Sequence, residues 1–331
     1  MIYRFTLFLG LLLLGPVEAY AAGETRSAVQ DRGYLICGVG IDDVGFASRQ
    51  ADGRWTGFEV DFCRAVAAAV LNDAEAVEFV PLDSLNRLRV LQDGQVDVLF
   101  RTTTHNFTRD VTLGLEFPAI TYYDTQKVLV FADTGASNLT DLDGMTICAN
   151  SGTTSIDNIR VAIERAGISV EILEIASQSG RWRAFFGREC QAVTADGSDL
   201  AARVASQPQY RTDFALLEDD ISNEPLGAVV RQSDPEWVHI VRWVVNLTIA
   251  AEANDLGQGS DTDQIADIGL PSGDTLGLAD TWGADVITQV GNYGEIFERN
   301  LGAGSPLNLP RGLNRLWSDG GLMYPLPMQA P

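Results

Sequence analysis

The chain has 331 residues, enough for two domains, and its 46% hydrophobic content is ordinary for a globular protein. It carries 23 Lys and Arg against 45 Asp and Glu, a net charge of −22. This acidic excess argues against nucleic acid or an anionic membrane surface as a partner. It does not identify the ligand, because a local arginine site can exist inside an acidic protein.

The N-terminal stretch 1–22 has the composition of a signal peptide. Arg4 supplies a positive charge, Phe5–Leu14 is an apolar run, and Ala19–Ala21 is a small-x-small cleavage signal. The apolar run is too short for a comfortable membrane span. No cysteine lies near the cleavage point, which argues against a lipid anchor. We therefore expect a soluble protein, exported through this signal peptide, with no membrane anchor of its own.

From residue 23 the elements are taken in chain order. Residues 23–32 are polar and predicted to form a loose arm. Strands are predicted near 35–39, 77–80 and 96–100, with helices near 61–71 and 85–91 between them. A strand-like run, 125–132, leads into an acidic stretch, 133–143, which we interpret as a crossing between lobes. Alternating strands and helices predict an α/β fold with mostly parallel sheets flanked by helices.

A second series of strands and helices follows the crossing. It comprises strands near 146–149, 170–174, 192–195 and 213–217, helices near 151–166 and 178–187, and a return strand near 225–231. Further helices are predicted at 236–251 and 284–300. We therefore predict two lobes, the first made of residues 23–131 and 228–331 and the second of residues 132–227.

The chain has four cysteines, Cys37, Cys63, Cys148 and Cys190. An exported protein meets an oxidising compartment, so two disulfides are expected. Three pairings are possible, and the sequential one, Cys37–Cys63 and Cys148–Cys190, would place one bridge in each half. Each bridge would then stabilise the fold by about 3–4 kcal/mol. The cysteine and histidine spacing matches no zinc pattern, so we expect no metal and no cofactor.

Polar side chains follow the strand near 96–100. Three threonines, Thr102 to Thr104, come first, and Arg109 follows. Ligands of α/β proteins bind at strand ends, a guanidinium matches a carboxylate, and threonine hydroxyls donate or accept hydrogen bonds. The segment indicates a socket for a small zwitterion such as an amino acid. A polar loop with a solvated arginine explains the segment alone equally well.

A similar turn begins a helix in the second half. Gly152, Thr153 and Thr154 follow a strand, and free amides at a helix N-terminus bind anions. Taken alone, the turn is better explained by Thr153 or Thr154 acting only as the helix N-cap. The matching arginine in the first half favours a ligand site.

Longer segments resemble one family. Gly57–Phe62, followed by Val66 and Val70, is similar to the signature of the periplasmic amino-acid-binding proteins of ABC transporters, solute-binding family 3. The segments Gly291–Asn300 and Arg311–Asn314 resemble its general or polar L-amino-acid-binding subgroup. The resemblance covers the mature chain and implies the type II periplasmic binding protein fold, in which two lobes hold the ligand in a cleft.

The resemblance also implies a ligand site. The carboxylate would be held by Arg109 with Thr102 and Thr104, and the α-ammonium by Asp196. These charges complement the two ends of an amino acid.

Thr153 and Thr154 would add donors from the second lobe. An aromatic residue of the first loop corresponds to Phe46, for which an ordinary core position is as good an explanation. His105 stands where relatives often carry an aromatic residue. It either lines the pocket and changes selectivity or stacks against the lobe surface, and we favour the pocket.

The expected function follows from the resemblance. A monomeric protein captures an L-amino acid between its lobes and delivers it to the membrane permease of an ABC transporter. The alternative is a periplasmic dehydratase-type enzyme on the same fold, acting on a cyclic amino or keto acid. Such an enzyme needs a placed acid or base. The sequence shows no nucleophile–base pair, so we expect a binding protein and not an enzyme.

Overall fold

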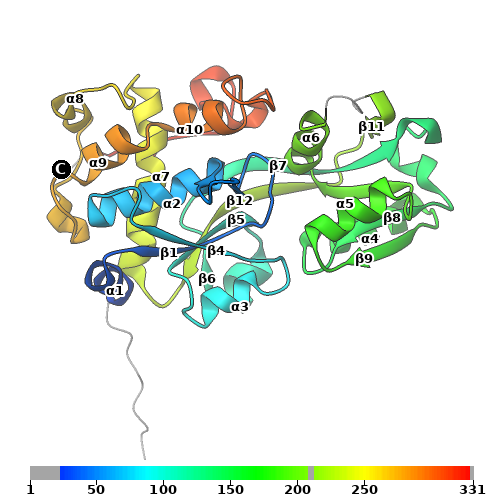
Figure 1. Cartoon of the computed structure of the whole chain (residues 1–331), viewed down its shortest axis with the longest axis horizontal. Coiled ribbons are helices and arrows are strands. Elements are labelled where there is room, and N and C mark those ends of the chain that lie inside the picture. The colour runs from blue at the N-terminus through cyan, green and yellow to red at the C-terminus, as the bar shows by residue number, and fades with distance from the viewer. Residues whose placement is uncertain (1–22, 208–211, 329–331) are drawn as a thin grey trace, which may run out of the picture.

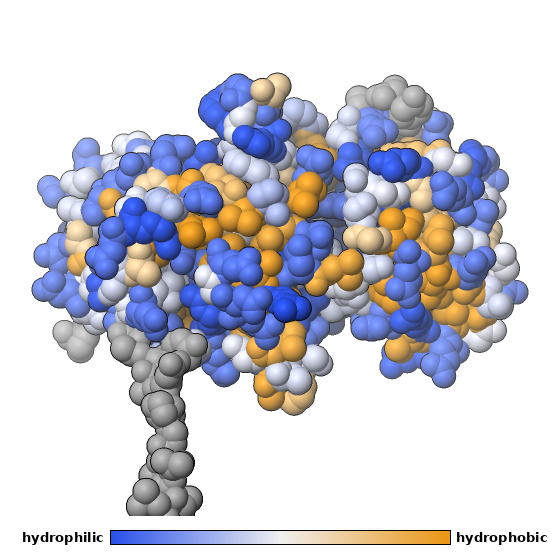
Figure 2. Space-filling view, turned by 60° about the horizontal axis from the view of Figure 1, so that its bottom comes forward, coloured by the Kyte–Doolittle hydropathy of each residue, from blue (hydrophilic) through white to orange (hydrophobic). Residues whose placement is uncertain are grey.

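The computed structural model describes residues 23–207 and 212–328. The predicted signal peptide, 1–22, lies outside the described residues. Two lobes stand side by side, joined by strands that run between them (Figure 1). In the space-filling view the molecule narrows between them, and hydrophilic and hydrophobic residues are mixed on both (Figure 2). Within the described ranges, no helix combines the length and apolar character that a membrane crossing requires.

The first lobe contains both the beginning and the end of the described chain. Its N-terminal elements are α1 (Glu24–Arg32), β1 (Leu35–Val39), β2 (Ser48–Arg49), β3 (Trp55–Thr56), α2 (Phe58–Leu71), β4 (Val77–Pro81), α3 (Arg87–Gln92), β5 (Val98–Thr104), η1 (Thr108–Thr112) and β6 (Leu115–Glu116). Its C-terminal elements are α7 (Pro235–Ala253), α8 (Thr262–Ala266), η5 (Gly273–Leu276), α9 (Trp282–Gln289), α10 (Tyr293–Asn300), η6 (Gly312–Asn314) and η7 (Trp317–Asp319).

The second lobe lies between two long strands, β7 (Ile120–Phe131) and β12 (Ser222–Arg231). Its elements are η2 (Ala132–Thr134), η3 (Leu139–Leu142), β8 (Thr146–Asn150), α4 (Thr154–Ala166), β9 (Glu171–Ile175), α5 (Gln178–Phe186), β10 (Ala192–Asp196), α6 (Gly197–Ala205) and β11 (Phe214–Leu216). The helix α6 was not predicted.

One continuous sheet runs through both lobes in the order β4-β1-β5-β12-β7-β10-β8-β9. The pairs β1–β4, β1–β5, β8–β9 and β8–β10 are parallel, as the alternation of strands and helices predicts. The pairs that involve β7 or β12 are antiparallel. The reason is that the chain leaves the first lobe along β7 and returns along β12 in the opposite direction.

The strand pairing locates the crossing earlier than the sequence predicts. Gln126 and the residues after it in β7 pair with β10, and Val128 and Leu129 lie in the hydrophobic cores of the second lobe. Leu226, which the sequence places in the second lobe, packs in the core of the first. We therefore propose lobe boundaries within the crossing strands, near Gln126 and Pro225.

The predicted loose arm is wrong, since residues 24–32 form the helix α1. The Asp234 carboxylate accepts hydrogen bonds from Gly23 N at 3.2 Å and Thr25 N at 2.9 Å, and Val29 is fully buried. Asp234 therefore caps the helix from 209 residues away in sequence. A polar segment with a distant cap gives no local helix signal.

The predicted long helix at 284–300 is two helices, α9 and α10. Gly291 between them has φ of 101°, a conformation that favours glycine. The Asn292 side chain accepts from Glu295 N, and the Glu295 carboxylate accepts from Asn292 N at 2.9 Å. This capping box starts the second helix.

Both predicted disulfides are confirmed. Cys37–Cys63 joins β1 to α2, and Cys148–Cys190 joins β8 to the residues just before β10. Their Cα–Cα distances are 6.1 Å and 5.8 Å. Each lobe therefore has its own bridge between a strand and a neighbouring element.

The segments that carry the family resemblance contact one another. The Asp61 carboxylate accepts from Arg299 Nε at 2.7 Å and from Asn300 Nδ2 at 2.6 Å. The Gly57 backbone lies so close to Phe46 that a Cβ atom would be 2.1 Å from the Phe46 carbonyl oxygen. At the C-terminal end, Asn314 bonds the backbone N–H and C=O of Tyr123 in β7. These segments hold the first loop, the C-terminal helices and the crossing strand in place.

Candidate functional site

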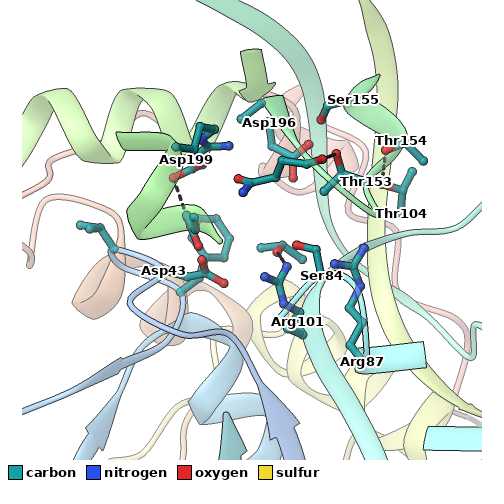
Figure 3. Close-up of a pocket in the computed structure, with 17 residues that line it drawn as sticks. Asp43, Ser84, Arg87, Arg101, Thr104, Thr153, Thr154, Ser155, Asp196 and Asp199 are labelled. Carbon is teal, nitrogen blue, oxygen red and sulfur yellow. Dashed lines mark hydrogen bonds and ion pairs between the residues drawn. The ribbon is translucent and has the colours of Figure 1, made fainter. Parts of the chain in front are cut away.

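A polar cavity of about 50 Å³ lies between the two lobes, smaller than an ordinary ligand pocket. The lobes touch at its rim, where a Cβ added to Gly152 would lie 3.0 Å from Leu85 Cδ2 and from Ser84 O. Charged and hydroxyl side chains face the cavity from both lobes (Figure 3). The lining consists of Asp43, Val44, Phe46, Ser84, Arg87, Arg101, Thr102, Thr104, Asn150, Thr153, Thr154, Ser155, Gln178, Arg181, Ala195, Asp196 and Asp199.

The end of β5 forms much of the first-lobe wall. Thr102 has φ of 33°, which is costly for a β-branched residue. Its backbone N–H donates to the carboxylate of Glu59 on α2, and that carboxylate is buried. Burial and the nearby Asp43 carboxylate raise the pKa of Glu59 to about 8, although the Thr102 N–H opposes the rise. Glu59, which lies within the segment Gly57–Phe62, thus stabilises the positive φ of Thr102.

The second-lobe wall is made of three helix starts. The first turns of α4, α5 and α6 contribute Thr154 and Ser155, then Gln178 and Arg181, then Asp199. Thr153 occupies the N-cap position of α4 but makes no side-chain cap hydrogen bond, since its hydroxyl donates to Asn150 O at 2.7 Å. The interpretation of Thr153 as only an N-cap therefore does not describe the structure. Uncapped helix amides next to a cavity favour an anion.

Glu224 links the two predicted threonine clusters. It is buried on the crossing strand β12, and its Oε2 accepts from Thr104 of the first lobe and from Thr154 of the second at 3.1 Å. Its Oε1 accepts from Asn158 Nδ2 at 2.8 Å and from Ser222 Oγ at 2.6 Å. The two threonines lie 3.4 Å apart through their hydroxyls. Residues 50 positions apart in sequence thus meet across the cleft.

The Asp196 carboxylate faces the cavity and has no hydrogen-bond or ion-pair partner among residues 23–207 and 212–328. Burial, with the negative charges of Asp124 and Glu224, raises its pKa well above the ordinary value. Burial also raises the pKa of Asp124 to about 6. A carboxylate in such surroundings ionises readily only when a cation arrives, so the position favours an ammonium ligand.

Arg109 is buried but is not among the lining residues. It lies on η1, and its Nη1 donates to the carbonyl oxygen of Thr104 at 2.8 Å. Burial lowers its pKa, and the carboxylates of Glu224 and Asp196 oppose that shift. Its guanidinium is therefore close to both the threonine cluster and the aspartate.

His105 does not line the cavity, contrary to the interpretation we favoured from the sequence. Its ring stacks on Phe117, with centroids 4.5 Å apart and planes 6° apart, and Nε2 lies 3.1 Å from Asp110 Oδ2. The residue stacks against the surface of the first lobe, which was the other sequence interpretation. The side chain points away from the cleft because alternate residues at a strand end face opposite sides.

Phe46 fits both of its sequence interpretations. It lines the cavity, and its ring packs edge-on against Tyr122 and Phe58 with centroids 5.4 Å and 5.9 Å away. Its other side therefore belongs to the core of the first lobe.

The structure brings Thr102, Thr104, Thr153, Thr154 and Asp196 to one cavity, as expected from the sequence. Sequence reasoning missed most of its charged residues. Arg101 stands directly before the threonines, but the sequence analysis assigned it no role. The others stand in loops or first helical turns with no motif of their own: Asp43, Arg87, Arg181 and Asp199.

The fold and the cavity define a class of protein. Two α/β lobes, crossed by two antiparallel strands and enclosing a polar cavity, are typical of type II periplasmic binding proteins. The sequence pattern of the bacterial extracellular solute-binding proteins, family 3, matches residues 35–255. The chain belongs to this family, as the comparisons with individual proteins also show.

Two relatives match almost end to end. The general L-amino acid-binding periplasmic protein AapJ of Rhizobium johnstonii is 36% identical over 97% of both chains. The glutamate/glutamine/aspartate/asparagine-binding protein BztA of Rhodobacter capsulatus is 38% identical over 97% of this chain and 98% of its own length. Among solved structures, a periplasmic binding protein from Brucella ovis with glutathione bound is 38% identical, with a TM-score of 0.86. It covers 94% of this chain and 100% of its own.

Proposed function

We propose that the protein binds an L-amino acid in the cavity between its lobes and delivers it to the permease of an ABC transporter. The unpartnered Asp196 carboxylate carries this proposal, because it is the acceptor that an α-ammonium group requires. The α-carboxylate accepts from the Thr102 hydroxyl and is neutralised by Arg109, which lies behind the cavity wall with its Nη1 on Thr104 O, while the Thr104 hydroxyl donates to Glu224.

The second lobe completes the contact. The amides of the first turn of α4 favour the same carboxylate, while the hydroxyls of Thr153 and Thr154 donate to Asn150 O and to Glu224 and so keep that turn in place. A ligand that touches both walls stabilises the closed arrangement over an open one. Phe46 packs on the ligand from the first loop. Two relatives whose names specify amino-acid binding support this ligand class.

We further propose that the protein acts as a monomer in the periplasm after removal of residues 1–22, and that it is not an enzyme. AapJ is named as a periplasmic protein, and YhdW of Escherichia coli, 35% identical, is named as a putative amino-acid ABC transporter-binding protein. The alternative, a dehydratase-type enzyme, needs a general acid or base positioned over a bound substrate. The sequence shows no nucleophile–base pair, and this favours the binding protein.

A calorimetric screen of the twenty amino acids against the mature protein tests this function. We expect at least one to bind, and Asp196→Asn to weaken that binding about 100-fold, because the ammonium loses its counter-charge. The matched control is Asp157→Asn, whose side chain is 82% exposed on α4. Failure of every amino acid to bind would refute the proposal, and equal affinity of the Asp196 variant would refute the ammonium site.

A further inference from the structure

The cavity is lined by more arginines than the single carboxylate of an ordinary amino acid needs. The single carboxylate of a simple zwitterion is assigned to Arg109 in the proposed function. Three further arginines, Arg87, Arg101 and Arg181, line the cavity. Arg181 is paired with Asp199 and stacks over Trp182. Arg87 and Arg101 are therefore the two lining arginines that are available to bind a further carboxylate.

Arg87 is a buried guanidinium without a partner. It is 2% exposed, and its Nε and Nη1 have no hydrogen-bond acceptor in the part of the chain that the structure describes. A buried and unpaired charge is strongly unfavourable, so such a side chain is expected to have a counter-ion when the protein performs its function.

The surroundings of Arg87 are cationic. Burial lowers its pKa, and the charges of Arg101 and Arg109 lower it further, while Asp196 and Asp43 oppose the shift less strongly. Asp43 is itself a poor counter-ion, since its Oδ2 is buried without a partner and burial raises its pKa. An added anion would therefore be attracted by several charges at once.

Arg101 is held in place beside Arg87. Its Nε donates to Leu82 O at 3.1 Å, and its Nη1 donates to Thr102 Oγ1 at 3.2 Å. Figure 3 shows Arg87, Ser84 and Arg101 along one wall, with Asp196 on the other side of the cavity. Two guanidiniums and a hydroxyl on one wall are the donors that a carboxylate takes.

We infer that Arg87 and Arg101 form a second carboxylate subsite, so the preferred ligand is an α-amino acid that carries a further carboxylate. This inference rests on the proposed function, which supplies the contacts of the α-amino and α-carboxyl groups. Two sources share the chemistry: an acidic amino acid, with its side-chain carboxylate, and a small peptide such as glutathione, with a terminal one. The residues that make the subsite lie on α3 and β5 of the first lobe, outside every motif recognised in the sequence.

Calorimetry with matched ligand pairs tests the subsite. L-glutamate is compared with L-glutamine, and reduced glutathione with the ester of its glycine carboxyl group, so that each pair differs in one charge. We expect the charged member of one pair to bind at least tenfold tighter. In Arg87→Gln that member should weaken at least 30-fold and its neutral counterpart less than threefold. The pair that responds identifies the source of the carboxylate.

The control is Arg89→Gln, which removes an arginine from the same helix where the side chain is 83% exposed. Arg89→Gln should leave the affinity for each of these ligands unchanged. The comparison of ligands in the unsubstituted protein remains a test even if Arg87→Gln does not fold. Equal affinities within both pairs, or equal losses for charged and neutral ligands in Arg87→Gln, would overturn the subsite. If neutral amino acids still bind in an Asp196-dependent way, the proposed function survives that failure, whereas absence of all binding refutes both.

Discussion

The two walls of the cavity differ in charge and in construction. The first-lobe wall presents Arg87 and Arg101 from a helix and a strand end, with Arg109 close behind. The second-lobe wall presents Asp196, an ion-paired Arg181 and the starts of α4, α5 and α6. A ligand with a carboxylate at one end and an ammonium at the other contacts both walls. The division of charge between the lobes therefore favours closure around an amino acid.

The largest expected effect comes from removing Arg109, whose guanidinium contacts the Thr104 carbonyl oxygen. Arg109→Ala should weaken binding of every amino acid ligand at least 100-fold, because the α-carboxylate loses a charged donor. Calorimetry measures this, with a melting curve to confirm folding and Arg89→Ala as the exposed control. Unchanged affinity would mean that the start of α4 or Arg101 holds the α-carboxylate, and the proposed division between the walls would need revision.

The two disulfides allow the lobes to be loosened separately. Replacing Cys148 and Cys190 with alanine opens a loop of 42 residues and should lower the free energy of unfolding by about 4 kcal/mol. The same change at Cys37 and Cys63 opens a loop of 26 residues and should lower it by about 3.5 kcal/mol. Denaturant unfolding measures both values.

Hydrogen exchange shows where each loss falls. Without Cys148–Cys190, amides of β8 and β10 should exchange faster while those of β1 and α2 keep their protection, and the reverse holds without Cys37–Cys63. Uniform acceleration in either variant would show that the lobes unfold as one unit.

A smaller effect should appear in the pH dependence of stability. The folded-state pKa of Glu59 is about 8, against an ordinary value of 4.5, so the folded protein binds its proton more tightly than the unfolded chain. Stability from this group is present at low pH and falls as pH rises from about 4.5 through 8, by up to about 1.4 kcal/mol per pH unit. Glu59→Gln should flatten this slope.

Urea denaturation between pH 5 and pH 9 measures the slope. The exposed Glu78 on β4 provides the matched control, and Glu78→Gln should leave the curve unchanged. Asp124 and Asp196, whose pKa values are also raised by burial, should leave a residual slope in the Glu59 variant. A slope identical to that of the unsubstituted protein would show that Glu59 is ionised in the folded state and that its bond to Thr102 outweighs burial.

The sequence by itself determined the α/β class, the main strands and helices, and six of the lining residues. Hydrophobic periodicity and glycine positions are local signals, so they located elements such as α2 and β8 closely. The strand-end threonines and the turn at Gly152 were recognisable for the same reason, because each motif is contiguous. The sequence also predicted two disulfides, and the sequential pairing, one of three possible, is the one that the structure has.

Only the tertiary structure decided which charges meet. Arg87 and Asp196 come from different lobes and from first turns or strand ends with no distinguishing pattern, yet they face one cavity. The direction of His105 depended on its packing against Phe117, and α1 on a cap from Asp234. Such contacts join residues far apart in the chain, and their energies come from burial and charge pairing that a single sequence does not display.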